Sequence, residues 1–253
     1  MSVLVSVLVS VLAGWRGVAR SLRVYRLDRA HAAGLRAFYR PFLRPGDLAF
    51  DVGAHVGDRT AAFRALGARV VAVEPQARLM RALRLLHGRD RGVTLVRAAL
   101  GAAEGETVLR VNTANPTVST LSGAFTEAAE GAAGWEGQRW DATETVPLTT
   151  LDALIARHGR PAFVKIDVEG FEAAVLAGLS QPPPALSFEV VAAARGAGLA
   201  ALARARALGY GAFRLSLGEG HVWAGDWIGG AAMAAALAAM PDAANSGDVY
   251  CRG

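Results

Sequence analysis

Cysteine and lysine are the two residue types that this sequence nearly lacks. Among its 253 residues, Cys251 is the only cysteine and Lys165 the only lysine. A single cysteine excludes an intramolecular disulfide and a zinc site built from cysteines, and it suits a reducing cytosol. Of the 27 basic residues, the 26 others are arginines. Together with the high alanine and glycine content, this indicates a GC-rich coding bias rather than a need for guanidinium chemistry.

A net positive charge is missing from most of the chain. Residues 1–46 carry a net charge of +7, from eight arginines and one acid, Asp28, whereas the whole chain carries +5. The remaining 207 residues therefore carry about −2, although a nucleic-acid-binding enzyme would need its basic surface there. The composition predicts no nucleic-acid partner. The eight arginines are Arg16, Arg20, Arg23, Arg26, Arg29, Arg36, Arg40 and Arg44.

No apolar run is long enough to cross a bilayer. The run MSVLVSVLVSVLA ends at Ala13, short of the ~20 residues that a transmembrane helix needs. Positive charge follows this run from Arg16 onward, whereas a secretory signal places it before the run. One hypothesis is a short helix in weak contact with a membrane surface. The alternatives are a helix packed on the domain and a start site assigned too early. We expect a cytoplasmic protein, at most peripheral to the membrane.

Apolar, strand-like runs alternate with helical ones, which is typical of a parallel sheet with helical crossovers. Predicted strands cover 47–52, 69–73, 93–97, 162–167, 185–191 and 248–251. Predicted helices cover 58–66, 76–87, 149–158, 170–178 and 196–208, with one more before Pro241. Residues 106–148 break the alternation and predict a lid or an insertion, with Trp135 and Trp140 either in its core or stacked on a ligand. We expect a helical extension over residues 1–37. Residues 38–253 should form one Rossmann-like α/β domain, with a mostly parallel sheet and helices on both faces.

The first chemical motif is DVGAHVG, residues 51–57, which follows a predicted strand and opens a predicted helix. Gly53 and Gly57 let the chain turn sharply and approach a ligand closely. Their G-x-x-x-G spacing departs from the G-x-G-x-x-G of dinucleotide-binding domains. Glu74 ends the next predicted strand, where an acid accepts hydrogen bonds from the ribose hydroxyls of an adenosine. The combination predicts an adenosine-containing ligand; the alternative is an ordinary tight turn and a solvated glutamate.

The second motif is FVKIDVEGFE, residues 163–172, at the carboxyl end of a predicted buried strand. Open α/β sheets bind their ligands at that edge. If the strand stays extended, Lys165, Asp167 and Glu169 share one face, and these charges would perturb each other's pKa values. The alternative is a helix N-terminus that carries acids favoured by its dipole, which explains Glu172 better than Asp167.

Several pieces of the chain, in this order, resemble the FkbM methyltransferase family. They are PFLRPGDLAFDVGAHVGDRT, VVAVEPQARLMRAL, VTLVRAALG, VPLTTLDALI and FVKIDVEGFEAAVLAGL. The resemblance covers roughly residues 38–191. It implies a class I methyltransferase fold, S-adenosylmethionine as the methyl donor, and a hydroxyl oxygen as the usual acceptor. Sugars and polyketide-type natural products are among the substrates of the family.

The resemblance also implies roles for single residues. It places Asp167 and Glu169 where they face the donor sulfonium and the acceptor. We add Lys165 to the predicted catalytic set, because it could orient the carboxylate and keep it ionised, and we predict no metal. One departure is His55, where the family commonly has asparagine; an imidazole is bulkier and titrates near neutral pH. The donor-binding set that we predict is Asp51, Gly53, Ala54, His55, Gly57, Glu74, Pro75 and Asp167.

The predicted activity is O-methylation of a small-molecule or glycan acceptor. A sugar or alcohol hydroxyl has a high pKa and needs a proton acceptor, for which we predict Asp167 or Glu169, with Glu189 a weaker candidate. Three alternatives remain open: a non-catalytic scaffold that binds S-adenosylmethionine, an RNA methyltransferase, and an NAD-dependent oxidoreductase. The near-neutral domain argues against the second, and the missing G-x-G-x-x-G argues against the third.

Overall fold

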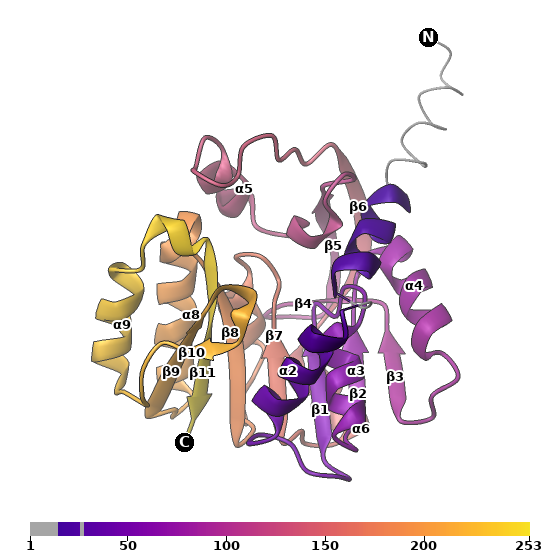
Figure 1. The fold of residues 1–253 in the computed structure, drawn as a ribbon, viewed down its shortest axis with the longest axis horizontal. Helices are drawn as coiled ribbons and strands as arrows, with labels where there is room; N and C mark the ends of the chain where they lie inside the picture. Colours follow the sequence, from indigo (N-terminus) through magenta and orange to yellow (C-terminus); the bar gives the residue numbers. More distant parts are fainter. Residues whose placement is uncertain (1–14, 26–27) are drawn as a thin grey trace.

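The computed structural model describes residues 15–25 and 28–253, which fold around one large sheet (Figure 1). In these residues the sheet has eight strands in the order β10-β9-β11-β8-β7-β1-β2-β3. The strands from β8 to β3 run parallel, and β11 runs antiparallel to both of its neighbours. The strands are β1 (Leu48–Val52), β2 (Arg69–Val73), β3 (Val93–Val96), β7 (Phe163–Ile166), β8 (Ala185–Val191), β9 (Ala212–Leu217), β10 (Val222–Trp223) and β11 (Ser246–Arg252).

Helices cover both faces of this sheet because its central strands are apolar on both sides. Along β1, Phe50 and Val52 face one hydrophobic cluster, shared with α6 to α9, and Ala49 faces another, shared with α2, α3 and α4. The helices are α2 (Arg29–Tyr39), α3 (Asp58–Ala65), α4 (Ala77–His87), α5 (Gly123–Ala129), α6 (Leu151–His158), α7 (Glu172–Ala177), α8 (Arg195–Ala207) and α9 (Gly230–Ala238). Short 3-10 turns are η1 (Pro116–Val118), η2 (Ala192–Ala194), η3 (Gly218–Gly220) and η4 (Asp242–Ala244).

Residues 106–148 form an insertion above the carboxyl ends of the parallel strands (Figure 1). Its base is a second sheet of three strands in the order β4-β6-β5, which are β4 (Ala99–Leu100), β6 (Ala142–Thr149) and β5 (Gly105–Val111). A separate hydrophobic cluster gathers Val118, Phe125 and Trp135 beneath α5. Trp140 packs against this cluster and donates its indole N–H to the carbonyl of Val118 at 2.8 Å. Both tryptophans therefore pack in the core of the insertion, and Trp135 also lines a cavity.

Residues 15–25 are helical and pack on the domain. Val18 is buried against Val56, Leu79 and Ala82, so the helix lies beside α4 and the loop after β1. The domain boundary at residue 37 stays a prediction, and residues 1–14 of the predicted extension lie outside the described residues. Within the described ranges, no helix has both the length and the apolar character to span a membrane.

The predicted order of elements is confirmed. The five predicted parallel strands and the five predicted crossover helices are all present, with ends within two residues of the prediction. The last strand and the helix before Pro241 are present as β11 and α9. β4, β6, β9 and β10 were not predicted. β6 alternates exposed and half-buried residues at the protein surface, which weakens its apolar signal.

Candidate active site

A cavity lies at the carboxyl ends of β1, β2, β7 and β8, and residues of the insertion also line it. It encloses about 940 Å³, its open mouth included. Every residue that the sequence placed in the site lines it, with the exception of Gly57. Unpredicted lining residues include Tyr25 of the 15–25 helix, Gln76 at the start of α4 and Thr117 of the insertion.

The loop after β1 owes its path to two glycines. Gly53 has φ of 78°, and a Cβ atom there would overlap the carbonyl oxygen of Asp167 at the end of β7. The amides of Gly53 and Ala54 both donate to the carbonyl of Val73 on β2, at 3.0 and 2.9 Å. Gly57 also has φ of 78° and caps the start of α3. The backbone of this loop is therefore held at the floor of the cavity, with no side chain in the way at position 53.

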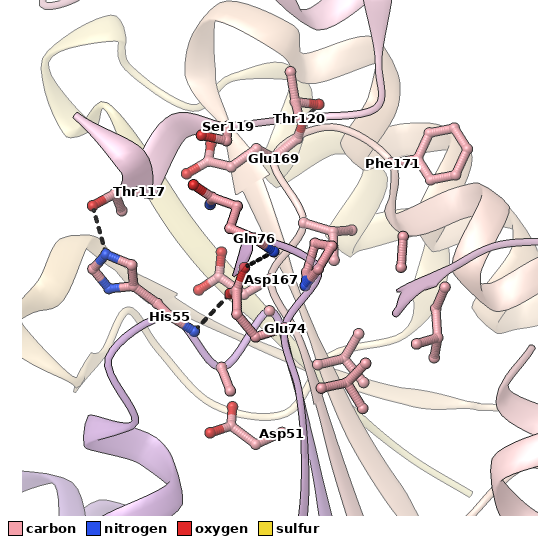
Figure 2. Close-up of a pocket in the computed structure, with 18 of the residues that line it drawn as sticks. Asp51, His55, Glu74, Gln76, Thr117, Ser119, Thr120, Asp167, Glu169 and Phe171 are labelled. Atoms are coloured by element: carbon pink, nitrogen blue, oxygen red, sulfur yellow. Dashed lines mark hydrogen bonds between the residues drawn. The ribbon is translucent and has the colours of Figure 1, made fainter. Parts of the chain in front are cut away.

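Asp51 and Glu74 end adjacent strands and are both buried. Asp51 accepts a hydrogen bond from the Thr60 hydroxyl at 2.5 Å, and burial raises its pKa to about 6. Glu74 accepts the backbone N–H groups of His55 at 3.0 Å and Gln76 at 2.8 Å, one on each carboxylate oxygen (Figure 2). Burial nevertheless raises the pKa of Glu74 to about 8. Its remaining acceptor positions face a cavity in which a hydrogen-bond donor would favour the ionised form.

His55 links this loop to two other segments of the chain. Its Nε2 atom lies 3.3 Å from the Thr117 hydroxyl on η1, as Figure 2 shows. Its ring meets the ring of Tyr25 edge-on, with centroids 5.6 Å apart. Next to it, the side-chain amide of Gln76 donates to the carbonyl of Pro116 at 2.9 Å. The insertion and the 15–25 helix thereby form a roof over the cavity.

Lys165 is a buried cation held between two carboxylates. Its Nζ atom lies 2.6 Å from Asp248 Oδ1 on β11 and 3.3 Å from Asp167 Oδ2. Burial opposes the charge on Lys165, but the two carboxylates outweigh it and hold the lysine pKa well above its ordinary value. Burial likewise opposes ionisation of Asp167, and Lys165 reverses this, so the aspartate pKa is lowered. Asp167 is therefore an ionised and weakly basic group.

The expectation that Lys165, Asp167 and Glu169 share one extended strand is wrong for Glu169. β7 ends at Ile166, and Glu169 has φ of 55°, in the left-handed region. The turn swings the Glu169 side chain to the side of β8. Carboxylate oxygens of Asp167, Glu169 and Glu189 then lie within 4.8 Å of one another. Pairing of β8 with β7 brings Glu189 into this group, a placement that local sequence patterns do not reveal.

The turn after β7 is fixed by the start of α7. The Glu172 carboxylate accepts the backbone N–H groups of Val168 at 3.1 Å and Gly170 at 3.2 Å. Burial raises the pKa of Glu172 to about 7. From the insertion, the Thr120 hydroxyl donates to the carbonyl of Glu169 at 2.6 Å. Glu172 thus lies in the first turn of α7, where the helix-terminus alternative expected an acid, and it also shapes the preceding turn. Hydrogen bonds from Thr120 to the Glu169 carbonyl and from Gly170 to Glu172 hold the backbone around Glu169.

The pKa of the Glu189 carboxylate is shifted upward, in the opposite direction to that of Asp167. Burial raises its pKa well above the ordinary value, and the negative charges of Asp167 and Glu169 raise it further. A group in this state is a stronger proton acceptor than an ordinary carboxylate once it is ionised. The three oxygens are also close enough to hold a metal ion. The ammonium of Lys165 beside Asp167 supplies positive charge there already, and the absence of a metal stays a prediction.

A second cavity adjoins the first at these acids. It encloses about 850 Å³, its mouth included, and shares Tyr25, Thr117, Glu169 and Glu189 with the first cavity. Its other walls come from the 15–25 helix, residues 114–118, Trp135 and the ends of β8 and β11. Polar side chains dominate its lining, with Arg20, Ser21, Asn115, Asn245 and Ser246 among them.

Sheet order, the glycine loop after β1 and the acid at the end of β2 define a Rossmann-like domain of the class I methyltransferase type. The profile of the Methyltransferase FkbM domain family matches residues 51–190, more than half of the chain. The protein belongs to the FkbM methyltransferase family and is an S-adenosylmethionine-dependent methyltransferase. A search of curated proteins finds no match to the chain.

Solved structures with a similar overall shape are remote in sequence. A precorrin-6y C5,15-methyltransferase from Geobacter metallireducens is 13% identical over 90% of both chains, with a TM-score of 0.46. A TehB-like SAM-dependent methyltransferase from Corynebacterium glutamicum is 9% identical over 92% of both chains, also at 0.46. The fibrillarin of Aeropyrum pernix, solved with bound S-adenosyl-L-methionine, is 10% identical over 82% of this chain and 67% of its own, at 0.41.

Proposed function

We propose that the protein transfers the methyl group of S-adenosylmethionine to a hydroxyl oxygen of a sugar, glycan or natural-product acceptor. The donor occupies the first cavity and the acceptor enters through the second. One observation carries this proposal: the two cavities meet at Glu169 and Glu189, so a hydroxyl group in the second cavity can reach a carboxylate that also faces the first.

The residues around the first cavity fit an adenosine-containing cation. Glu74 binds the two ribose hydroxyls. These donate two further hydrogen bonds to a buried carboxylate whose pKa is still raised although it already accepts two backbone N–H groups. Gly53 and Ala54 offer close approach to their backbone, and His55 and Pro75 line the cavity beside Glu74.

The remaining members of the predicted set act less directly. Gly57 shapes the loop from outside the cavity, by capping α3. Asp51 and Asp167 add negative charge on the donor side, which favours a positively charged ligand.

Proton removal is assigned to the acids at the junction. The donor supplies a methyl group on a positively charged sulfur, so alignment of the hydroxyl oxygen contributes most, roughly 7–11 kcal/mol in well-positioned systems. Glu189 accepts the hydroxyl proton and adds about 10²–10⁴ in rate. A cation beside the three acids lowers the pKa of Glu189, so the base becomes ionised when the donor is present. Glu169 is the second choice, and Asp167 is the weakest base because Lys165 stabilises its charge.

Lys165 is a positioning residue in this scheme. It is 1% exposed and does not line the second cavity. It therefore orients Asp167 through their hydrogen bond and does not contact an acceptor. The tie to Asp248 on β11 fixes the ammonium from the other side.

Labelled methyl transfer tests the proposal. The protein is incubated with S-adenosylmethionine carrying an isotopic methyl group and with a panel of methyl glycosides, phenols, carboxylic acids and amines. The proposal predicts label in alkali-stable ethers. Label only in alkali-labile esters or in amines would contradict it. Donor binding without transfer to any class would favour the alternative, a scaffold that binds the donor without catalysis.

A further inference from the structure

The helix formed by residues 15–25 packs one face against the rest of the domain. Val18 is 2% exposed and Ser21 5%, and Gly17 is also buried. A Cβ atom on Gly17 would meet Pro116 and the carbonyl oxygens of residues 113 and 114, so the helix lies close against the insertion. The face that carries Gly17, Val18 and Ser21 is therefore packed against the domain, and the opposite face of the helix points to solvent.

The outer face combines arginine with exposed apolar side chains. Trp15 is 39% exposed and Val24 52%, and both belong to the few large apolar side chains at the surface of the described residues. At 3.6 residues per turn the exposed positions cover about half of the helix circumference. No Asp or Glu occurs between residues 15 and 25. The exposed positions are Trp15, Arg16, Ala19, Arg20, Arg23 and Val24, and we call them the outer face.

This chemistry fits a phospholipid surface better than bulk water. Tryptophan prefers the boundary between head groups and acyl chains, and arginine keeps its charge at the phosphates while its stem covers apolar surface. A helix that lies in the interface carries basic residues together with such apolar groups. The preceding residues 1–14 include eight valines and leucines and no charged residue. Since the chain beyond residue 46 carries about −2, attraction to anionic lipid is concentrated in this N-terminal part.

We propose that the outer face docks the protein on an anionic phospholipid bilayer. Arg20 and Val24 belong to the outer face and also line the second cavity, so docking brings the mouth of that cavity to the lipid head groups. If the proposed function holds, the acceptor is then an amphiphile whose hydroxylated head group enters the cavity while its apolar part stays in the bilayer. The docking itself needs no methyl transfer.

Vesicle co-sedimentation of the full chain tests the docking. The vesicles contain phosphatidylcholine alone or mixed with phosphatidylglycerol, at low and raised salt. The test variant is Arg16→Gln/Arg20→Gln/Arg23→Gln. A matched control, Arg69→Gln/Arg89→Gln/Arg91→Gln, removes the same charge from exposed positions at or just before the amino ends of β2 and β3, the end of the sheet that faces away from the insertion. Circular dichroism and S-adenosylhomocysteine binding check that both variants fold.

We expect binding to the phosphatidylglycerol vesicles that weakens with salt. Each arginine at such a surface strengthens partitioning roughly fivefold, so the test variant should bind about 100-fold more weakly and the control less than about tenfold. Trp15→Ala should weaken binding as well, with the arginines intact. The proposal would be overturned if the two triple variants lost vesicle binding equally, or if the parent protein did not bind vesicles. Displacement of the protein from vesicles by a single-stranded RNA at equal charge would also overturn it. Vesicle binding by a protein that does not bind S-adenosylhomocysteine would refute the proposed function alone.

Discussion

The two cavities are built in different ways. The walls of the first come mainly from strand ends and the turns that follow them, with Gly53 and Glu74 within one stretch of about 25 residues. The second is assembled from the 15–25 helix, the insertion and the ends of β8 and β11, which are far apart in the sequence. The first cavity, which we propose for the donor, is therefore fixed mainly by the sheet, whereas the second, which we propose for the acceptor, depends on added segments. A change on one side should affect one ligand and leave the other.

The largest expected effect lies where the cavities meet. Glu189→Gln should lower kcat by about 10²–10⁴, because the amide cannot accept the hydroxyl proton. The affinity for S-adenosylhomocysteine should change less than about threefold, since Glu189 has no assigned contact with the adenosine. Single-turnover methyl transfer and calorimetry measure the two quantities. Glu104→Gln, at an exposed acid that lines neither cavity, is the control.

Glu169→Gln and Asp167→Asn complete that comparison. If turnover survives in Glu189→Gln and falls in Glu169→Gln, the base is Glu169. Near-full turnover with normal donor binding in all three variants would remove the carboxylate base from the mechanism.

Gly53→Ala tests how strictly the sheet fixes the donor side. The new Cβ overlaps the Asp167 carbonyl, so S-adenosylhomocysteine affinity should fall about 100-fold or more, or the fold should loosen. Gly46→Ala is a matched control, because Gly46 has φ of 90° and a Cβ atom added there would have no neighbour within 4 Å. The Gly46→Ala variant should lose only the roughly 1–2 kcal/mol of stability that a non-glycine residue costs in the left-handed conformation. Similar donor affinities in both variants, measured by calorimetry, would show that position 53 has no special role.

The pH dependence of donor binding tests Glu74. Its pKa is about 8 in the free protein, so below pH 8 it is mostly protonated. Ribose hydroxyls favour the ionised form, and binding then releases a proton. The affinity for S-adenosylhomocysteine should rise with pH, by up to about tenfold per unit below pH 8, and level off above it. S-adenosylhomocysteine is the better ligand for this test because it carries no sulfonium charge. It therefore does not lower the pKa of Glu189, which would add a second pH dependence. A flat profile in the parent protein, or an unchanged slope in Glu74→Gln, would contradict this role.

The smallest effect belongs to the acceptor side. Asn115 lines the second cavity and not the first. Asn115→Ala should raise KM for the acceptor by about tenfold, the value of one lost hydrogen bond, with kcat and donor affinity nearly unchanged. Steady-state kinetics with the best acceptor of the panel measures it. A larger effect on donor affinity than on acceptor KM would break the division between the two sides.

This division also explains what the sequence could predict. Strands β1, β2 and β7 are short apolar runs followed by glycine or acidic residues, and their local pattern locates both them and the cavity at their ends. Gly53, Glu74 and Asp167 were found for that reason. The turn at Glu169 escaped prediction because it depends on Glu172 and Thr120, which hold the backbone in a left-handed conformation.

Residues that reach the site by long-range packing were harder to predict. Glu189 was only a weak candidate from the sequence, since its place beside Asp167 follows from the pairing of β7 with β8. Tyr25 and Thr117 were not predicted at all, because nothing local shows that both contact His55. Such contacts carry no periodic signal in the sequence.

The central claim is that the first cavity binds S-adenosylmethionine, and a thermal shift with S-adenosylhomocysteine and NAD at equal concentration tests it most directly. At 100 times its Kd, a one-site ligand stabilises the folded protein by about 2.7 kcal/mol. For a chain of this size that raises Tm by roughly 5–11 °C. We predict this shift with S-adenosylhomocysteine and none with NAD. An equal shift with NAD, or no shift with either ligand, would contradict the account.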